Sequence, residues 1–431
     1  MNKTTDQNHA KAVRIYVAVL ALAALAAGMS DTVLSNYFKD AYQVTAFQRG
    51  MIELPRELPG FIGIFIVSAL AFLGDLRIAA VAQALMVIGL LLLGFLTPAY
   101  AVMLLFIFIH SVGGHLWYPL SDSIGLHLIK SDERAGRVVG RFKGVSTAFS
   151  MLAAIIVFLG FRFDLFSFTT PIKSIFLIAG AIFLVVLVLL LMLERLLKAP
   201  RIAHPNLGDQ VAGNGDGKPA RRVRFVFRKE YKYYYALAIV FGVQKQIMMV
   251  FAPWVLIDLL GKKADTLALL GMAGAFIGIF FIPALGRWLD RFGIKRLLYV
   301  DAFSFIVVYI LYGLLSAGFS GGFLAKTGLP VALVFALFII DRMSMQMGLI
   351  RSLYLRNIAL KPEDIAPTMT LGQSMDHVVS IACATLGGLV WTVWGPQYVF
   401  FLAAFFSLIN YGVARLAVVR EEPVIEEPVL E

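Results

Sequence analysis

The stretch GRWLDRFGIKR, residues 286–296, is a short charged segment between two long apolar runs. The run before it contains Pro283 and Leu285, and the run after it begins at Leu297. Apolar runs of this length can cross a bilayer, and the basic residues between them favour the cytoplasmic side. The stretch therefore predicts a tight loop that joins two membrane-spanning helices at the cytoplasmic surface.

The composition of the whole chain supports a membrane protein with many spans. Hydrophobic residues make up 60% of 431 positions, charged residues only 15%, and the mean hydropathy is +0.82. These values exclude a soluble globular protein. The net charge of +11 comes from basic residues dispersed among the loops, so we expect no nucleic-acid partner. The single cysteine, Cys383, excludes an intrachain disulfide framework.

About twelve apolar runs of spanning length are predicted to be transmembrane helices. The first follows Arg14 and lasts to about Asn36, which is too long for the core of a secretory signal. The other runs centre on Ile62, Met86, Phe106, Ala153, Phe183, Ile239, Phe276, Ile306, Val334, Ile381 and Phe405.

Basic residues predict the orientation of these helices. The loop after the fourth run holds five basic residues between Lys130 and Lys143, whereas the alternate loops hold two or fewer, such as Lys39 and Arg49. Both termini are therefore expected in the cytoplasm, with the chain in the cytoplasmic (inner) membrane. The expected division is a cytoplasmic N-terminus (1–12), a six-helix bundle (13–194), a polar, glycine-rich cytoplasmic linker (195–232), a second six-helix bundle (233–419) and an acidic tail (420–431).

The two halves show signs of an internal repeat. The pentapeptide FIGIF occurs at residues 61–65 and again at 276–280, and the same offset of 215 carries Asp75 onto Asp290. Such an offset is expected of two six-helix repeats related by an axis along the membrane normal. At this offset Ala71 stands where Gly286 does, so the first copy is eroded.

The charged stretch resembles the loop signature of the major facilitator superfamily of secondary transporters. The resemblance implies an all-α polytopic fold of twelve transmembrane helices in two pseudo-symmetric six-helix bundles. It also implies that the loop aspartate caps a neighbouring helix and that the basic residues tie the cytoplasmic face shut. The residues that match this gate motif are Gly286, Asp290, Arg291, Gly293, Lys295 and Arg296, with Asp75 and Arg77 in the eroded copy.

Ionisable residues inside the apolar runs are the candidate functional residues, because a charge at mid-membrane costs about 2.5–3.5 kcal/mol on translocon scales. Asp31 in the first run and Lys245 in the seventh occupy nearly equivalent positions of the repeat. We expect them to pair or to face a wet cavity. A static salt bridge and a pair that breaks during transport both remain open.

The second run contains the densest charged cluster, with Glu53, Arg56 and Glu57 on one helical face. Arg56 can pair with either glutamate, which leaves one negative charge that must find a partner or take up a proton. Glu53 and Glu57 are therefore candidates for proton coupling. The alternative is a partly wetted cluster near the outer surface.

Three further runs add polar residues at membrane depth. His110 and His115 of the fourth run could carry protons or donate to an anionic substrate, or they could be satisfied within the fold. Asp341 and Arg342 of the tenth run are adjacent, so their side chains diverge by about 100° around the helix. The eleventh run offers a proton relay or a helix-packing hydrogen bond, formed by Asp376 and His377.

These residues form two sets of candidates. The substrate set consists of Asp31, Arg56, His110, His115, Lys245, Asp341 and Arg342. The proton-coupling set consists of Glu53, Glu57, Asp341, Asp376 and His377.

The motif inventory favours a transporter over an enzyme. No HExxH or paired-ligand spacing predicts a metal site, and no GxSxG or GK[ST] loop predicts catalysis or ATP use, so no cofactor is expected. We expect a monomeric secondary transporter that moves a small organic solute by alternating access, coupled to protons. Fixed cations in the runs favour an anionic solute, namely Arg56, Lys245 and Arg342.

Two alternatives remain. One is the efflux of amphipathic compounds by the same fold, in which all these cations are neutralised. The fifth run lacks the GP and paired glycines that resemblance to the drug antiporters would require, which weighs against multidrug export. The other is a membrane receptor or sensor that keeps the fold without transport.

Overall fold

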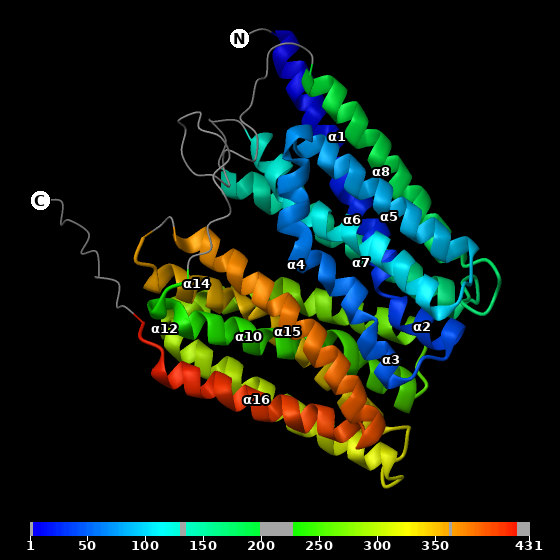
Figure 1. Cartoon of the computed structure of the whole chain (residues 1–431), viewed down its shortest axis with the longest axis vertical. Coiled ribbons are helices and arrows are strands. Elements are labelled where there is room, and N and C mark those ends of the chain that lie inside the picture. The colour runs from blue at the N-terminus through cyan, green and yellow to red at the C-terminus, as the bar shows by residue number, and fades with distance from the viewer. Residues whose placement is uncertain (1–2, 130–134, 199–226, 362–363, 420–431) are drawn as a thin grey trace, which may run out of the picture.

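The computed structural model describes residues 3–129, 135–198, 227–361 and 364–419, and the regular structure within them is helical (Figure 1). The predicted acidic tail and most of the predicted linker, residues 199–226, lie outside the described residues.

The first half runs from α1 to α8. Its elements are α1 (Lys3–Asp31), α2 (Leu34–Tyr42), α3 (Ala46–Met51), α4 (Glu53–Leu70), η1 (Ala71–Leu73), α5 (Asp75–Phe95), α6 (Tyr100–His127), α7 (Ala135–Arg162) and α8 (Ser174–Lys198). α3 begins at a capping box, because the Thr45 hydroxyl accepts from the Gln48 backbone N–H and the Gln48 side chain accepts from the Thr45 N–H. This box turns the chain back into the second span.

The second half runs from η2 to α16. Its elements are η2 (Lys229–Tyr231), α10 (Lys232–Gln246), the π-helical η3 (Ile247–Phe251), α11 (Ala252–Trp254), the π-helical η4 (Val255–Leu259), α12 (Ala264–Ser320), α13 (Leu329–Gln346), α14 (Gly348–Ile358), α15 (Ile365–Val393) and α16 (Pro396–Leu416). Pro253 lacks the N–H that an α-helix would use at this position, which fits the irregular winding around it.

The charged stretch at 286–296 contains the predicted tight connection between two spans, which is reduced to a kink at one residue. Within the 57-residue α12 only Gly293 leaves helical geometry, with φ 78° and ψ 164°, and two helices meet there. Gly74, which precedes α5, has nearly the same backbone angles, φ 77° and ψ 158°. These glycines therefore mark the same turn in the two halves, at an offset of 219 and not 215. Asp75 follows its glycine whereas Asp290 precedes it, so the two aspartates are not equivalent.

Ten helices among the described residues are long and apolar enough to cross a membrane. α12 is one of them, yet 57 residues extend about 86 Å at 1.5 Å per residue, against a hydrocarbon core of about 30 Å. The break at Gly293 divides it into two spans. With α12 counted as two and the charged α4 included, the described helices accommodate the twelve predicted spans, and every predicted centre lies in a helix.

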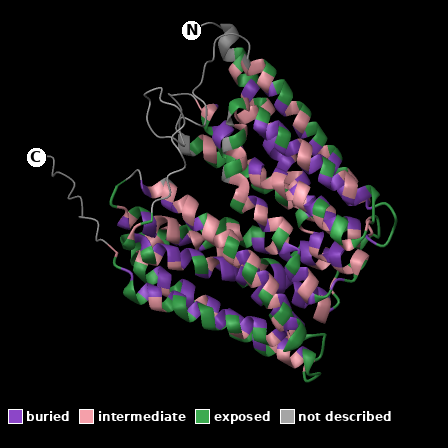
Figure 2. Cartoon of the chain, viewed as in Figure 1, coloured by how far each residue is buried: buried purple, intermediate pink, exposed green. Residues whose placement is uncertain are grey.

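The helices form two bundles that meet at one end and diverge toward the other (Figure 1). α3 and α4 pack on α15, α7 packs on α12, and α2 packs on η4. We call the end that carries the start of α1 and the end of α16 the terminal end; the bundles lie apart there. Buried residues follow the faces where helices pack, and exposed residues cover outer faces such as that of α16 (Figure 2).

The opposite end is closed by very close contact between α3 and α15. A Cβ atom at Gly50 would lie 2.1 Å from the carbonyl oxygen of Ala384, and one at Gly388 would lie 2.5 Å from that of Ala46. Small residues permit such an approach of two backbones. An ion pair of 2.5 Å between Lys39 of α2 and Asp258 of η4 adds a polar contact between the halves.

Candidate functional site

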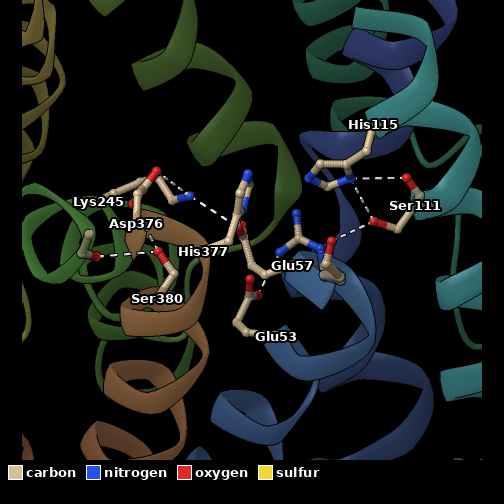
Figure 3. Close-up of polar contacts among 10 residues, drawn as sticks. Glu53, Glu57, Ser111, His115, Lys245, Asp376, His377 and Ser380 are labelled. Carbon is tan, nitrogen blue, oxygen red and sulfur yellow. Dashed lines mark hydrogen bonds and ion pairs between the residues drawn. The ribbon is translucent and has the colours of Figure 1, made fainter. Parts of the chain in front are cut away.

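A cluster of charged and polar side chains lies where the two bundles meet, and Figure 3 shows Glu57 between residues of both halves. We call it the central cluster. Its members are Arg49, Glu53, Arg56, Glu57, Ser111 and His115 of the first half, and Lys245, Asp376, His377 and Ser380 of the second.

Within the central cluster, Glu57 makes a direct ionic contact with the other half. Its Oε2 atom accepts from Lys245 Nζ at 3.0 Å and from His377 Nδ1 at 2.7 Å. The side chains of Glu57 and Lys245 are only 9% and 14% exposed. Hydrogen bonds between charged groups are strong in such surroundings, and the loss of one partner leaves the other charge buried. The contact therefore couples α4 to α10 and α15.

Lys245 is shared between one carboxylate of each half. Besides Glu57 it reaches Asp376 Oδ2 at 3.3 Å, and Asp376 Oδ1 accepts from Ser380 Oγ at 3.2 Å. Gly242 allows α10 to approach, because a Cβ atom there would lie 2.9 Å from the Asp376 carbonyl oxygen. Of the two predicted residues of α15, Asp376 therefore contacts Lys245, whereas His377 contacts Glu57.

Of the two outcomes expected for Asp31 and Lys245, the pairing is not made in this conformation. Asp31 ends α1, its side chain is 45% exposed, and its Oδ1 atom lies 3.7 Å from His110 Nε2. Lys245 pairs with Glu57 and Asp376 instead. The two residues do mark matching irregularities, since α1 breaks after Asp31 and α10 passes into a π-helix after Gln246.

Glu53 is held by two arginines and not by one. Its Oε1 atom lies 2.6 Å from an Nη1 atom of both Arg49 and Arg56. Arg49 was expected in an outer loop, but it is 1% exposed and lies inside the bundle. The surplus negative charge expected on α4 therefore finds a partner, because Arg49 joins Glu53 and Lys245 neutralises Glu57. Glu53 and its two arginines together carry one surplus positive charge.

The two predicted histidines of α6 have different places. His115 Nδ1 donates to the Ser111 carbonyl at 3.0 Å, and its ring centre lies 5.4 Å from that of His377. Gly60 makes this meeting possible, because a Cβ atom there would lie 2.3 Å from His377 and 2.7 Å from His115. His110 instead packs against Gly89 of α5, inside the first bundle.

Asp341 and Arg342 lie outside the central cluster and diverge as their adjacency predicts. Asp341 is fully buried, and Tyr309 donates its hydroxyl to Oδ1 at 3.5 Å. The Oδ2 atom of Asp341 has no partner among the described residues. Arg342 stacks over the ring of Phe338 at 4.8 Å.

The gate-motif residues make contacts in the first half. Asp75 Oδ2 accepts from Ser123 Oγ at 2.9 Å, which ties α5 to α6, and Arg77 pairs with Glu194 of α8 at 2.6 Å.

The second copy of the gate motif, at residues 286–296, makes few contacts. Asp290 and Arg291 are exposed, and in the described part of the chain no hydrogen bond or ion pair joins them to another helix. Arg291 lies over the adjacent ring of Phe292, while Lys295 and Arg296 are exposed and Gly286 borders open space. The expected tie at the terminal end is therefore not made in this conformation.

Comparison with known proteins identifies the family. A family model described as Major Facilitator Superfamily matches residues 16–361. The chain belongs to the major facilitator superfamily. No curated protein matches the sequence.

Solved structures agree on the fold of this major facilitator protein. It resembles the nucleoside transporter NupG (12% identity, TM-score 0.70, covering 95% of this chain and 99% of that one). It also resembles a POT family transporter in complex with 5-aminolevulinic acid (13% identity, TM-score 0.72, covering 94% of this chain and 96% of that one). A third similar structure is an inward-facing bacterial homologue of the iron transporter ferroportin (11% identity, TM-score 0.68, covering 93% of this chain and 99% of that one). Identities this low show the fold alone. The protein is a multi-pass membrane transporter and not an enzyme.

Proposed function

We propose that this protein moves a small organic anion across the cytoplasmic membrane by alternating access, with protons as the coupling ion. The observation that carries the proposal is the ion pair of Glu57 with Lys245, because it joins the two halves inside the protein. A contact of this kind must break when the halves rock apart. It is therefore a natural element of the transport cycle and not only of the fold.

The proposed state of the cycle is inward-open, with the terminal end in the cytoplasm. Its support is the close approach of Gly50 and Gly388 to the opposite half at the far end. At the terminal end, Asp122 and Lys143 of the first half are 61% and 64% exposed and pair with each other. Asp290 of the second half is exposed as well.

Lys245 gives the cycle a way to separate the halves without leaving an ammonium group unpaired. When Glu57 moves away with the first half, Lys245 keeps Asp376 of its own half. Glu57 then loses both of its donors, Lys245 and His377. In the outward-open state, water or another polar group must take their place at Glu57.

The distribution of positive charge supports an anionic solute. Arg49 and Arg56 share the single carboxylate of Glu53. Arg342 and Arg351 stack on aromatic rings, and no carboxylate lies within ion-pair distance of them among the described residues. Surplus cations at membrane depth suit a carboxylate or phosphate group. The alternative of amphipathic efflux requires that Arg56, Lys245 and Arg342 all be neutralised. Arg56 and Lys245 have carboxylate partners, whereas Arg342 has none among the described residues.

Asp341 is the group through which we propose that protons are coupled. Its carboxyl group is fully buried in α13, and Oδ2 lacks a partner within the described residues. Burying a carboxylate without a paired cation is costly, and taking up a proton removes that cost. Movement of α13 during the cycle would expose or bury this group and so link proton uptake to transport.

Flux into proteoliposomes tests the proposal. Purified protein is supplied with a panel of organic carboxylates and phosphates under an imposed pH gradient, and accumulation is expected for at least one of them. Asp341→Asn should abolish accumulation driven by the gradient while solute exchange at equal pH continues. Asp301→Asn is the matched control, since Asp301 is also buried but is bonded to Asn410 at 3.3 Å.

Three outcomes would contradict parts of the proposal. Accumulation that survives collapse of the pH gradient would exclude protons as the coupling ion. Movement of lipophilic cations in place of anions would favour amphipathic efflux. Binding of a solute with no flux would favour a receptor.

A further inference from the structure

We infer that the central cluster also binds a divalent transition-metal ion of the zinc type, held by Glu57, His115 and His377. These residues come from α4, α6 and α15, and each offers a ligand atom within 4.8 Å of the other two. The set contains two residues of the first half and one of the second. No sequence motif indicates this site, because its members are brought together only by the fold.

The hydrogen bonds of the two histidines orient them for metal binding. His115 Nδ1 donates to the Ser111 carbonyl at 3.0 Å, and His377 Nδ1 donates to Glu57 Oε2 at 2.7 Å. In His115 the protonated Nδ1 leaves Nε2 with the free lone pair, and metal-binding histidines characteristically donate their other ring N–H to a carbonyl in this way. In His377 the ion takes the place of the proton between Nδ1 and Glu57 Oε2, so that both of these atoms bind it.

Gly60 makes room where the two rings meet. A Cβ atom at this position would lie 2.5 Å from His377 Nε2 and 2.7 Å from His115 Cδ2. Any other residue would therefore push the rings apart. Glycine on α4 keeps both imidazoles and the Glu57 carboxylate of the next turn within reach of one ion.

The charges beside the ligands allow a divalent cation. The central cluster holds three carboxylates and three cations, but Arg49 and Arg56 both pair with Glu53 at 2.6 Å. Beside the ligands, Glu57 and Asp376 carry two negative charges against the one positive charge of Lys245, and Lys245 can rely on Asp376 at 3.3 Å. Two imidazoles and one carboxylate are a donor set that suits zinc, whereas calcium and magnesium prefer oxygen ligands throughout.

An ion at this position bridges the halves and holds them in the present conformation. This consequence follows from the origin of the ligands and does not depend on which solute the protein carries. A metal ion of this class therefore acts as a clamp on the conformational change.

Cobalt(II) absorption provides the test. The full chain is purified without a histidine tag, stripped with a chelator and titrated with Co²⁺, whose visible bands are intense when it is tetrahedrally coordinated. We expect one ion per chain, displaced by Zn²⁺, and a melting temperature that rises with Zn²⁺. His115→Gln and His377→Gln should each weaken binding at least tenfold, whereas His110→Gln, the matched control on α6, should bind as the parent does.

A thiol variant separates loss of a ligand from loss of the fold. His115→Cys should restore binding and add an intense sulfur-to-cobalt charge-transfer band, which only direct coordination produces. Absence of Co²⁺ bands in the parent protein would overturn the inference. Equal affinity in His115→Gln and in the parent would overturn it as well.

Discussion

Replacing Glu57 by glutamine should shift the protein away from the conformation described here. Glu57 Oε2 accepts two charge-assisted hydrogen bonds from the other half, at 3.0 Å from Lys245 and 2.7 Å from His377. Each such bond contributes about 1.5–3 kcal/mol. Glutamine keeps an acceptor oxygen and Lys245 keeps Asp376, so we expect a net loss of about one bond. That loss changes the ratio of the two conformations about 10- to 150-fold.

Electron-electron double resonance between two spin labels measures this shift. Labels are placed at exposed positions on the two halves by Arg137→Cys in α7 and Lys295→Cys in α12, with Cys383→Ser to remove the native thiol. A chelator keeps metal ions out of the central cluster. The Glu57→Gln protein should gain a population with the labels closer together, because closure of the terminal end accompanies separation of the halves at the opposite end.

Glu53→Gln provides the matched control for this experiment. Glu53 is bonded to Arg49 and Arg56, which belong to the same half, so its neutralisation breaks no contact between the halves among the described residues. An unchanged distance distribution in Glu57→Gln would refute the reasoning. An equal shift in Glu53→Gln would refute it too, since the effect would then come from charge on α4 and not from the bridge.

Three further predictions concern contacts outside the central cluster. Lys39→Asp or Asp258→Lys alone should lower stability by about 0.5–1 kcal/mol, and the double reversal should restore it, as measured by melting at low salt. Gly50→Ala should lower the melting temperature because its Cβ would lie 2.1 Å from the α15 backbone, whereas Gly63→Ala, which borders open space, should not. Burial lowers the pKa of Lys173 from its usual 10.5, so the unfolded chain binds the Lys173 proton more tightly than the folded chain does. The free energy of unfolding should therefore rise as the pH approaches 10.5. Lys173→Met should remove that rise.

The positions of the helices could be predicted because a membrane span is a local property of the sequence. About twenty apolar residues in a row suffice to indicate one, whatever lies beside them. The turn between the two spans of α12 was predicted as well, although the chain leaves helical geometry only at Gly293. The repeat, however, was misaligned by four residues. A short apolar match such as FIGIF can be aligned one helical turn away from the true register, because apolar residues recur on every turn. The positive φ shared by Gly74 and Gly293 occurs at one position in each half and so fixes the register.

The members of the central cluster were easier to predict than its contacts. Glu57, Lys245 and His377 were found because ionisable residues stand out in apolar runs. The pairing of these residues was not predicted, because residues 57 and 245 are far apart in the sequence and only the packing of five helices brings the cluster together. Arg49 is a different case. It lies four residues before Glu53, so the ordinary helical spacing of ion pairs could have identified it.

The shared position of Lys245 predicts which second change should rescue its loss. Lys245→Ala leaves the carboxylates of Glu57 and Asp376 without their ammonium partner, and removing one member of a buried pair costs about 3–5 kcal/mol. Neutralising a stranded carboxylate by Glu57→Gln or Asp376→Asn should recover part of that cost. Asp31→Asn should recover none, because Asp31 lies beside His110 and not beside Lys245.

Melting temperatures of the single and double variants decide between these partners. Residues in one network show interaction free energies of about 0.5–3 kcal/mol in a double-mutant cycle, whereas residues without contact add independently. The cycle of Lys245 with Glu57 should therefore give a clear interaction, and that with Asp31 should give a value near zero. Rescue by Asp31→Asn as strong as that by Glu57→Gln would show that Asp31 is the partner after all, and that the bridge between the halves is built from different residues.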